Sequence, residues 1–370
     1  MALDARLRAI SLSSPSAAIW IATALLFLLS FVLAPSTTNP NAILGILPFA
    51  ALLALAGIGQ TLVVQQRGLD LTVAPMITLS AILITKIPNG NDALLPVALT
   101  AVAVVAIVAG LISGLAVTRL WITPVVATLG VGALLSGVVL QVTGGAFSGS
   151  AAPALDAFAF GKTFGIPNTV IVAVIAVAAV AIVVRNTVIG RWFVAVGANP
   201  EAALAAGLPV DRIRVATYVV ASLAYAFTGV MLAGFVGTPG LAAGDGYLLA
   251  TVAAVVLGGT ALAGGNGSVV ATAGGAIFLT QLSAVATGMG APAPAQLILE
   301  GTIIALGMGL RNVPWHRLRR AAASSGRGPS VDGTPPSSSD GPTHGPGGDR
   351  SEAPSAGLSP SRRSAHPANG

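Results

Sequence analysis

The chain has 370 residues, of which 54% are hydrophobic and only 8% are charged; its mean hydropathy is +0.87 and its net charge is +6. This composition leaves too little polar surface to coat a water-soluble globule. It excludes soluble enzymes and soluble nucleic-acid-binding domains and indicates a protein embedded in a lipid bilayer. The absence of cysteine excludes disulfides, thiolate metal sites and cysteine catalysis.

Long apolar runs predict the fold class. Spanning segments must satisfy their own backbone hydrogen bonds, which leaves helices or closed barrels, and runs of this length select helices. About 20 helical residues cross roughly 30 Å of hydrocarbon. We therefore predict an all-α polytopic membrane protein with about ten transmembrane helices, some of them short or discontinuous. In chain order the expected spans are 18–33, 43–64, 69–85, 94–117, 123–142, 168–184, 215–236, 247–263, 268–288 and 295–310.

The first apolar run follows two arginines, so a secretory signal peptide is the alternative interpretation for it. Its apolar part continues past signal length, and the region around Ala34 and Pro35 makes a poor cleavage site. Removing it would also leave nine helices. We therefore interpret residues 1–17 as a cytoplasmic amino-terminal segment and residues 18–312 as one transmembrane domain.

The basic residues between the spans predict the orientation of the chain. If the amino terminus is cytoplasmic, all 18 Lys and Arg residues except Lys86 and Lys162 fall on the inner side. This bias follows the positive-inside rule and supports an even number of spans with both termini in the cytoplasm. Anionic lipid headgroups account for the positive charge, so no nucleic-acid partner is expected.

After Arg320 the composition changes abruptly to Pro, Gly and Ser with almost nothing apolar. We interpret residues 313–370 as a basic juxtamembrane segment followed by a disordered cytoplasmic tail. The three histidines, His316, His344 and His366, all lie in or near this tail. They form neither a metal site nor a catalytic triad, so the chain is not expected to be an enzyme or to bind a cofactor itself.

Two ionisable residues lie inside apolar runs, where a charge is costly and usually has a reason to be present. Asp70 opens a run in "RGLDLTVAP", where its carboxylate can cap free amides with Arg67 as a nearby counter-ion. Pro75 in the same run should kink or break the helix, as in the discontinuous helices of transport pathways. Glu300 lies one turn into the last span, where exposure near the outer headgroups is the alternative to a function.

Few residues are therefore candidates for a solute pathway or its gate. For Asp70, a purely structural role as a cap is the alternative. Elsewhere, Gly110 and Gly114 have the spacing that lets two helix backbones approach closely, which favours packing over a pore role. The candidate pathway or gating residues are Asp70, Thr72, Pro75, Thr128, Gln141 and Glu300.

Residues 185–214 form the largest inner loop, and the stretch "GANPEAALAAG" within it predicts a helix of about two turns. Asn199 and Pro200 suit its amino end, Glu201 complements the positive helix end, and Gly207 can terminate it in the left-handed conformation. Such a short helix is marginal alone, so it must pack against something. A groove on another protein is expected, and a helix lying on the membrane surface is the alternative. The candidate contacts are Asn199, Pro200, Glu201, Ala202, Ala203 and Gly207.

This loop resembles the "EAA…G" loop of ABC-importer permeases, whose short coupling helix docks into a cleft of the cytoplasmic ATPase. Three further stretches, together with the extended loop, occur in the order seen in the ribose/xylose-type permease family, which also includes branched-chain amino acid permeases. "GLDLT" is similar to the "GIDLS" pattern of that family and favours its sugar branch, whereas Pro75 stands where Gly or Ser is common. The stretches are "GLDLTVAPMITLSA" (68–81), "ITPVVATLGVGALLSGVVLQVTGG" (122–145), "VGANPEAALAAGLPVDRIRVATYVVAS" (196–222) and "AGDGYLLATVAAVVLGGTALAGGNGS" (243–268).

The resemblance covers most of residues 57–312 and implies the permease subunit of an ATP-driven importer in a bacterial plasma membrane. Its cargo would be a small polar solute, above all a monosaccharide such as ribose or xylose. The implied partners are a cytoplasmic ABC ATPase that binds the ATP, an extracytoplasmic solute-binding protein, and a second permease copy or paralogue. The alternatives are a branched-chain amino acid or nucleoside permease of the same type, an ion-coupled secondary carrier, and a non-transporting membrane scaffold.

Overall fold

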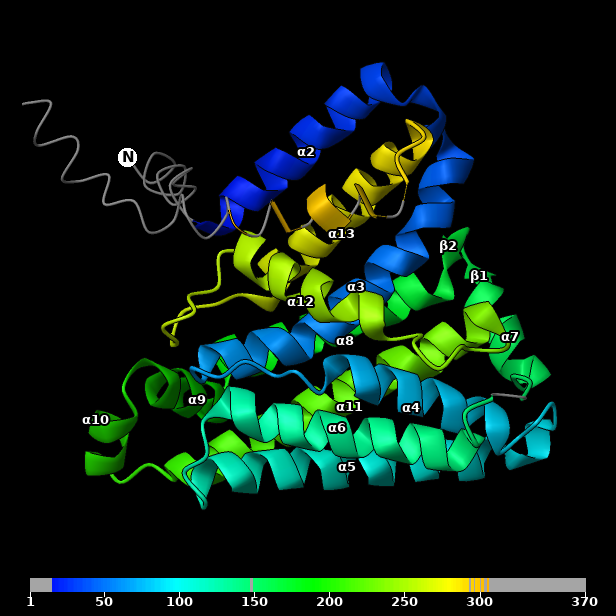
Figure 1. Cartoon of the computed structure of the whole chain (residues 1–370). Coiled ribbons are helices and arrows are strands. Elements are labelled where there is room, and N and C mark those ends of the chain that lie inside the picture. The colour runs from blue at the N-terminus through cyan, green and yellow to red at the C-terminus, as the bar shows by residue number, and fades with distance from the viewer. Residues whose placement is uncertain are drawn as a thin grey trace, which may run out of the picture. The chain divides into compact units, whose positions relative to one another are not determined.

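A computed structural model describes residues 15–146, 149–292, 294, 295, 297–299, 301, 302 and 305. These residues belong to a unit over Met1–Val313; a second unit, Pro314–Gly370, lies outside them, as does the predicted tail. Within the described residues the elements are helices, apart from one short hairpin (Figure 1). In chain order they are α2 (Pro15–Leu33), η1 (Pro35–Thr37), α3 (Pro40–Gln65), α4 (Val73–Lys86), η2 (Asp92–Leu94), α5 (Leu95–Thr118), α6 (Pro124–Thr143), α7 (Pro153–Phe160), β1 (Lys162–Thr163), β2 (Ile166–Pro167), α8 (Asn168–Asn186), α9 (Val188–Ala198), α10 (Pro200–Ala205), α11 (Val210–Val236), α12 (Asp245–Leu257) and α13 (Val269–Gly288).

The all-helical, multi-pass architecture is confirmed, but the count of ten long spans is not. Nine expected spans each coincide with a described helix, whereas the tenth, 295–310, lies mostly outside the described residues. In the part of the chain that is described, six helices are long and apolar enough to cross a membrane: α3, η2 with α5, α6, α8, α11 and α13. The helices α2, α4, α9 and α12 are apolar but shorter.

The core forms around α3 and α11, which lie in the middle of the bundle. Helix α11 packs against α3, α4 and α5, while α13 packs against α2, α3 and α12 (Figure 1). Every residue of α3 from Ala50 to Gln65 is buried. By contrast, α5, α6 and α8 expose large apolar side chains such as Leu111, Leu134 and Ile175, which suits a surface covered by lipid tails.

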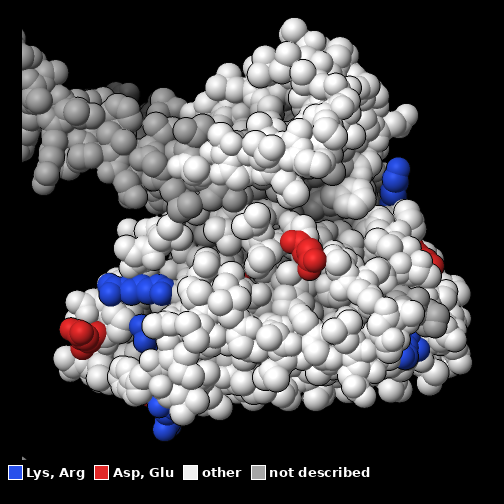
Figure 2. Space-filling model, viewed as in Figure 1, with Lys and Arg blue, Asp and Glu red and all other residues white. Residues whose placement is uncertain are grey.

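Apart from an acidic side chain near the centre of the view, the charged side chains in Figure 2 lie toward the two ends of the long helices. Arg119 at the end of α5 and Arg212 at the start of α11 line one cavity at the same end. Lys86, the last residue of α4, and Lys162, the first residue of β1, lie at the other end. There the Lys86 side chain donates to the Val142 carbonyl. The surface between the ends of α5 and α6 is almost uncharged in this view, as a hydrocarbon-facing band requires. That the arginine-rich end faces the cytoplasm stays a prediction.

Two of the short helices, α4 and α12, meet at their amino ends; α4 begins at the buried Val73, and α12 begins at the exposed Asp245. Helix α4 has 14 residues and α12 has 13, so each is about 20 Å long and too short to cross the hydrocarbon layer. Their amino ends meet: the Gly244 amide, just before α12, donates to Thr78 Oγ1 of α4 at 2.9 Å. A Cβ on Gly244 would collide with the Ala74 carbonyl. This pairing is the discontinuous arrangement typical of transport proteins.

The expected kink at Pro75 is wrong in its location. Helix α4 begins at Val73 rather than residue 69, and Pro75 lies in its first turn, where the missing N–H of proline is not needed. The chain is broken before Pro75, between the end of α3 and Val73. The prediction of a discontinuous helix is correct, but proline is not its cause.

Glycines allow α5 and α11 to approach each other closely. A Cβ on Gly110 would lie 2.5 Å from the Val219 Cα, and a Cβ on Gly114 would lie 2.8 Å from the Val215 Cα. Both distances are too short for any side chain, so only glycine permits this packing. The interpretation of this pair as a packing motif is therefore confirmed.

We expect Gly110→Ala to lower the stability of the folded chain, because the added methyl group must push two helix backbones apart. Overpacking of this kind costs about 1–3 kcal/mol. The apparent melting temperature in detergent measures the effect. Gly130→Ala in α6 is the matched control, because nothing lies within 4 Å of a Cβ built there. Equal melting temperatures for the two variants would contradict the close packing.

Candidate functional site

The short helix α10 has the ends that its sequence predicts. Asn199 precedes it in an extended conformation, and its Oδ1 accepts the Ala202 amide at 3.0 Å. Pro200 occupies the first helical position. At the other end Gly207 has φ +78°, and the Leu208 amide donates to the Ala203 carbonyl at 3.0 Å. This pattern is a Schellman motif, so the helix is six residues long and stops where expected.

One face of α10 packs against its own chain. Ala203 is 5% exposed and forms a small apolar cluster with Val196 of α9 and Val210 of α11. Glu201, Ala202, Leu204 and Ala205 are exposed. The required packing is therefore supplied within the molecule, and Ala203 holds the helix in place rather than offering a contact to a partner.

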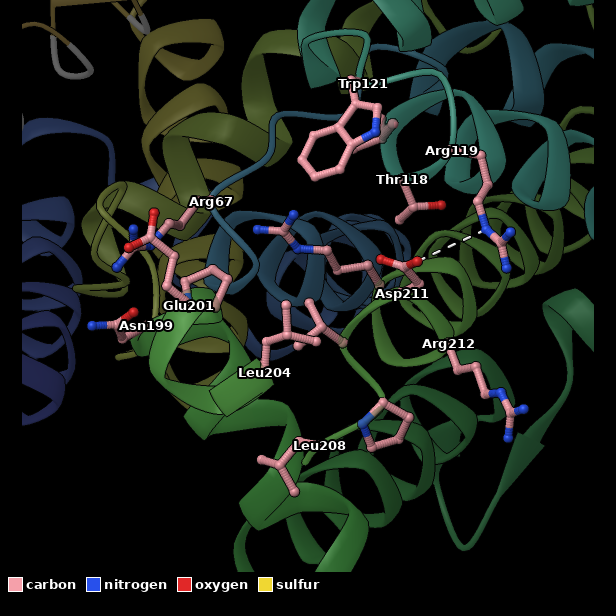
Figure 3. A pocket seen from close by; sticks show the side chains of 15 residues that line it. Arg67, Thr118, Arg119, Trp121, Asn199, Glu201, Leu204, Leu208, Asp211 and Arg212 are labelled. Atoms are coloured by element: carbon pink, nitrogen blue, oxygen red, sulfur yellow. Dashed lines mark ion pairs between the residues drawn. The ribbon is translucent and has the colours of Figure 1, made fainter. Parts of the chain in front are cut away.

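A cavity of about 940 Å³ opens beside α10 (Figure 3). Its walls come from the end of α3, the α5–α6 connection, α10 and the start of α11. Four arginines and two acids line it: Arg67, Arg119, Arg212, Arg214, Glu201 and Asp211. The cavity is therefore basic overall. Arg119 and Asp211 form an exposed ion pair at 3.8 Å, which contributes little to stability, about 0–1 kcal/mol.

Arg67 closes the end of α3 in an unusual way. The Arg67 amide donates to the Val64 carbonyl and the Gly68 amide to the Val63 carbonyl, each at 3.0 Å, which is a second Schellman motif. The position that glycine usually takes is occupied by Arg67 with φ +63°. A left-handed conformation costs a non-glycine residue about 1–2 kcal/mol. Something in the fold must offset this cost.

The side chain of Arg67 supplies the offsetting contacts. Its Nε donates to the Gly197 carbonyl at 3.0 Å and its Nη2 to the Ala198 carbonyl. These carbonyls end α9, where a helix lacks internal donors and its dipole favours a cation. The expectation that Arg67 is the counter-ion of Asp70 is therefore wrong, because the guanidinium is turned toward α9. A basic residue just after a span gives no sign of that direction.

Three of the predicted pathway residues meet at the break before α4. Asp70 is 1% exposed, and its Oδ1 accepts the Thr72 amide at 2.9 Å and the Thr72 hydroxyl at 2.7 Å. Thr128 of α6 accepts the Leu71 amide at 3.1 Å, and its hydroxyl lies 3.2 Å from the Leu69 carbonyl. The polar groups of the broken backbone are thus satisfied by side chains, as burial in a membrane protein requires. Capping by Asp70 is confirmed, although it serves a turn before the helix.

The remaining predicted residues lie elsewhere. Pro75 lines a cavity of about 180 Å³ together with Thr78 and Asp245, at the meeting point of α4 and α12. Gln141 is exposed near the carboxyl end of α6 and is not brought to the Asp70 cluster. Glu300 lies outside the described residues.

Two buried polar residues near Asp70 are absent from the candidate set. Tyr225 of α11 lies beside the Asp70 carboxylate, and its hydroxyl donates to Gln60 Oε1 of α3 at 3.1 Å. Both side chains are fully buried. The available signal was a glutamine and a tyrosine inside apolar runs, but neither is ionised at neutral pH and neither stands out in a search for charges.

Comparison with known proteins identifies the family of the chain. Residues 42–307 match the family described as branched-chain amino acid transport system / permease component. The chain is 32% identical over 283 residues to the ribose import permease protein RbsC of Bacillus subtilis, covering 76% of this chain and 87% of the relative. It is 30% identical to the autoinducer 2 import system permease protein LsrC of Yersinia pseudotuberculosis (78% and 86% covered). It is also 30% identical to the galactose/methyl galactoside import permease protein MglC of Haemophilus influenzae (79% and 93% covered). No solved structure matches significantly.

We expect Thr128→Val to destabilise the break before α4, because it removes the hydroxyl that accepts the Leu71 amide while keeping a similar shape. A buried amide left without a partner costs about 1–3 kcal/mol. The melting temperature and the hydrogen-exchange rate of residues 69–72 measure the change. Thr128→Ser should restore both. Thr100→Val is the control, because the exposed Thr100 hydroxyl donates within its own helix.

Proposed function

The chain belongs to the family of branched-chain amino acid transport system permease components, and we propose that it is the subunit through which an ATP-driven importer carries a monosaccharide into the cell. Its membership makes it a multi-pass permease component of the bacterial inner membrane and not itself an ATPase. The proposal thus starts from the established family, that of import permeases. The solute, the partners and the residues that act belong to the proposal.

The specificities of the relatives carry the choice of solute. Relatives that match over most of their length are named for ribose, galactose or methyl galactoside, and autoinducer 2. The "GLDLT" sequence at residues 68–72 supports the sugar branch. Aromatic residues make up only 5% of the chain, which argues against a deep sugar site built from stacked rings. We therefore assign most of the solute recognition to a separate extracytoplasmic binding protein.

The geometry around α10 supports a role for this helix in coupling. It is held to α9 and α11 by Ala203, while Glu201 and Leu204 are exposed beside a basic cavity. A rigidly mounted, partly exposed helix is suited to dock into a cleft of an ABC ATPase. Closure of two ATPases on ATP would then push α10 and shift the bundle between inward-facing and outward-facing packings. The permease would act as a dimer with a second copy or a paralogue.

Transport measurements test this proposal directly. The chain is reconstituted in lipid vesicles with the ATPase and the binding protein encoded in neighbouring reading frames, and uptake of radiolabelled ribose is followed with and without ATP. We expect ribose to accumulate only with ATP. Added galactose should reduce this uptake, whereas leucine and uridine should not. Competition by leucine or uridine would instead favour the amino acid or nucleoside alternative. Uptake by the chain alone under an ion gradient would replace the proposal with a secondary carrier, and absence of any flux would favour a scaffold.

We expect Glu201→Lys and Gly207→Val each to reduce ATP-dependent uptake by at least tenfold without changing the melting temperature by more than a few degrees. The first reverses the charge of an exposed residue on α10. The second forces a β-branched residue into φ +78°, which disrupts the end of that helix although open space surrounds it. Leu120→Ala, outside α10, is the control for loss of an exposed side chain. Normal uptake by both variants would remove α10 from the coupling mechanism.

A further inference from the structure

The end of α3 holds the turn between α9 and α10 through two consecutive side chains. Arg67 donates to the carbonyls of Gly197 and Ala198, and Gln66 donates from Nε2 to the Phe193 carbonyl at 2.8 Å. All three acceptors belong to α9, and Ala198 is followed directly by the residue that caps α10. Any displacement of α10 therefore acts on these contacts within one or two residues.

The turn between α12 and α13 packs against the same place, where the end of α3 meets the turn between α9 and α10. The Gly265 amide donates to the Gln65 carbonyl at 2.9 Å. Gly264 and Gly265 both have positive φ, and a Cβ on Gly264 would collide with the Arg67 side chain and lie 2.7 Å from the Gly197 carbonyl oxygen. Arg67 is therefore packed closely on the side of Gly264, while its other side faces the cavity beside α10.

The segment between Arg67 and α4 is also held by close packing and hydrogen bonds. A Cβ on Gly68 would lie 2.7 Å from the Tyr218 hydroxyl of α11. Asp70 and Thr72 are tied by two hydrogen bonds, and Thr128 of α6 accepts the amide between them. Five residues separate Arg67 from the first turn of α4. A short segment that is held at each step behaves as a stiff connection rather than a flexible loop.

We propose that Arg67 is a positioning residue that transmits the displacement of α10 to the amino end of α4, where the two short helices meet. This inference rests on the proposed function of the chain as an ATP-driven permease. It explains why a non-glycine residue occupies a left-handed position that glycine would adopt with less strain: the guanidinium is needed at the end of α9. The alternative route from α10 is covalent and leads into α11, because only four residues separate the two helices.

The substitution Arg67→Gly separates the two readings of this residue. Glycine keeps the left-handed turn and removes the guanidinium, so a role confined to ending α3 would leave it neutral or more stable. In the assembled transporter with Arg67→Gly, we expect the ATPase to hydrolyse ATP at a rate within twofold of the wild type. Uptake of radiolabelled ribose should be at least tenfold slower. Arg67→Lys should recover part of the uptake, since one ammonium can reach one carbonyl. Arg191→Ala, an exposed arginine of α9, is the matched control and should keep both rates.

A normal ratio of uptake to ATP hydrolysis in Arg67→Gly would overturn the proposal and assign transmission to α11. A parallel loss of hydrolysis and uptake would also overturn it, because it indicates a defect in ATPase docking or folding. The melting temperature of Arg67→Gly, compared with the wild type, distinguishes those two causes.

A second measurement does not depend on the solute. Leu71→Cys introduces the first cysteine into a chain that has none, so its maleimide reactivity reports on the break before α4. We expect trapping of the ATPase with ATP and vanadate to change the labelling rate at least threefold, and Arg67→Gly to abolish this change. An unaltered response in Arg67→Gly would contradict the inference. If the response is found but the wild type does not carry ribose, the inference stands and the proposed solute fails.

Discussion

The requirement that every backbone polar group be satisfied without water governs this molecule. Most of the described chain meets it with helices, but the segment between α3 and α4 leaves the helical conformation while buried in the bundle. Side chains replace the missing helical bonds there: Asp70 receives the Thr72 amide and Thr128 receives the Leu71 amide. The break is therefore satisfied partly by its own Asp70 and partly by Thr128 of the adjacent α6. Likewise, the chain just before α12 is held to α4 because Thr78 receives the Gly244 amide.

This constraint links the interior to the arginine-rich end of the molecule. The same segment that is buried at Asp70 emerges at Arg67 and ends α9, next to the helix proposed to meet the ATPase. Helices α3 and α10 end in the same motif, with Arg67 in one and Gly207 in the other. In α10 glycine serves only to stop the helix. In α3 the side chain adds a tether between two parts of the fold that are 130 residues apart.

Local signals in the sequence were sufficient wherever the deciding contacts are local. The cap at Asn199, the end at Gly207 and the close pair Gly110 and Gly114 follow from neighbouring residues, and the structure confirms them. Long apolar runs predicted nine described helices, but run length could not show that the amino ends of α4 and α12 meet, because the contacts that hold them join residues distant in sequence. The direction of the Arg67 side chain was mispredicted for the same reason. Helix α9 was missed because it lies in what length alone presented as a loop.

The left-handed arginine has a consequence for protein engineering. Consensus and thermostability screens favour glycine at positions with positive φ, since that exchange relieves backbone strain. At residue 67 the contacts of the guanidinium with α9 offset that strain. A library ranked by melting temperature alone would therefore not register the loss of this tether.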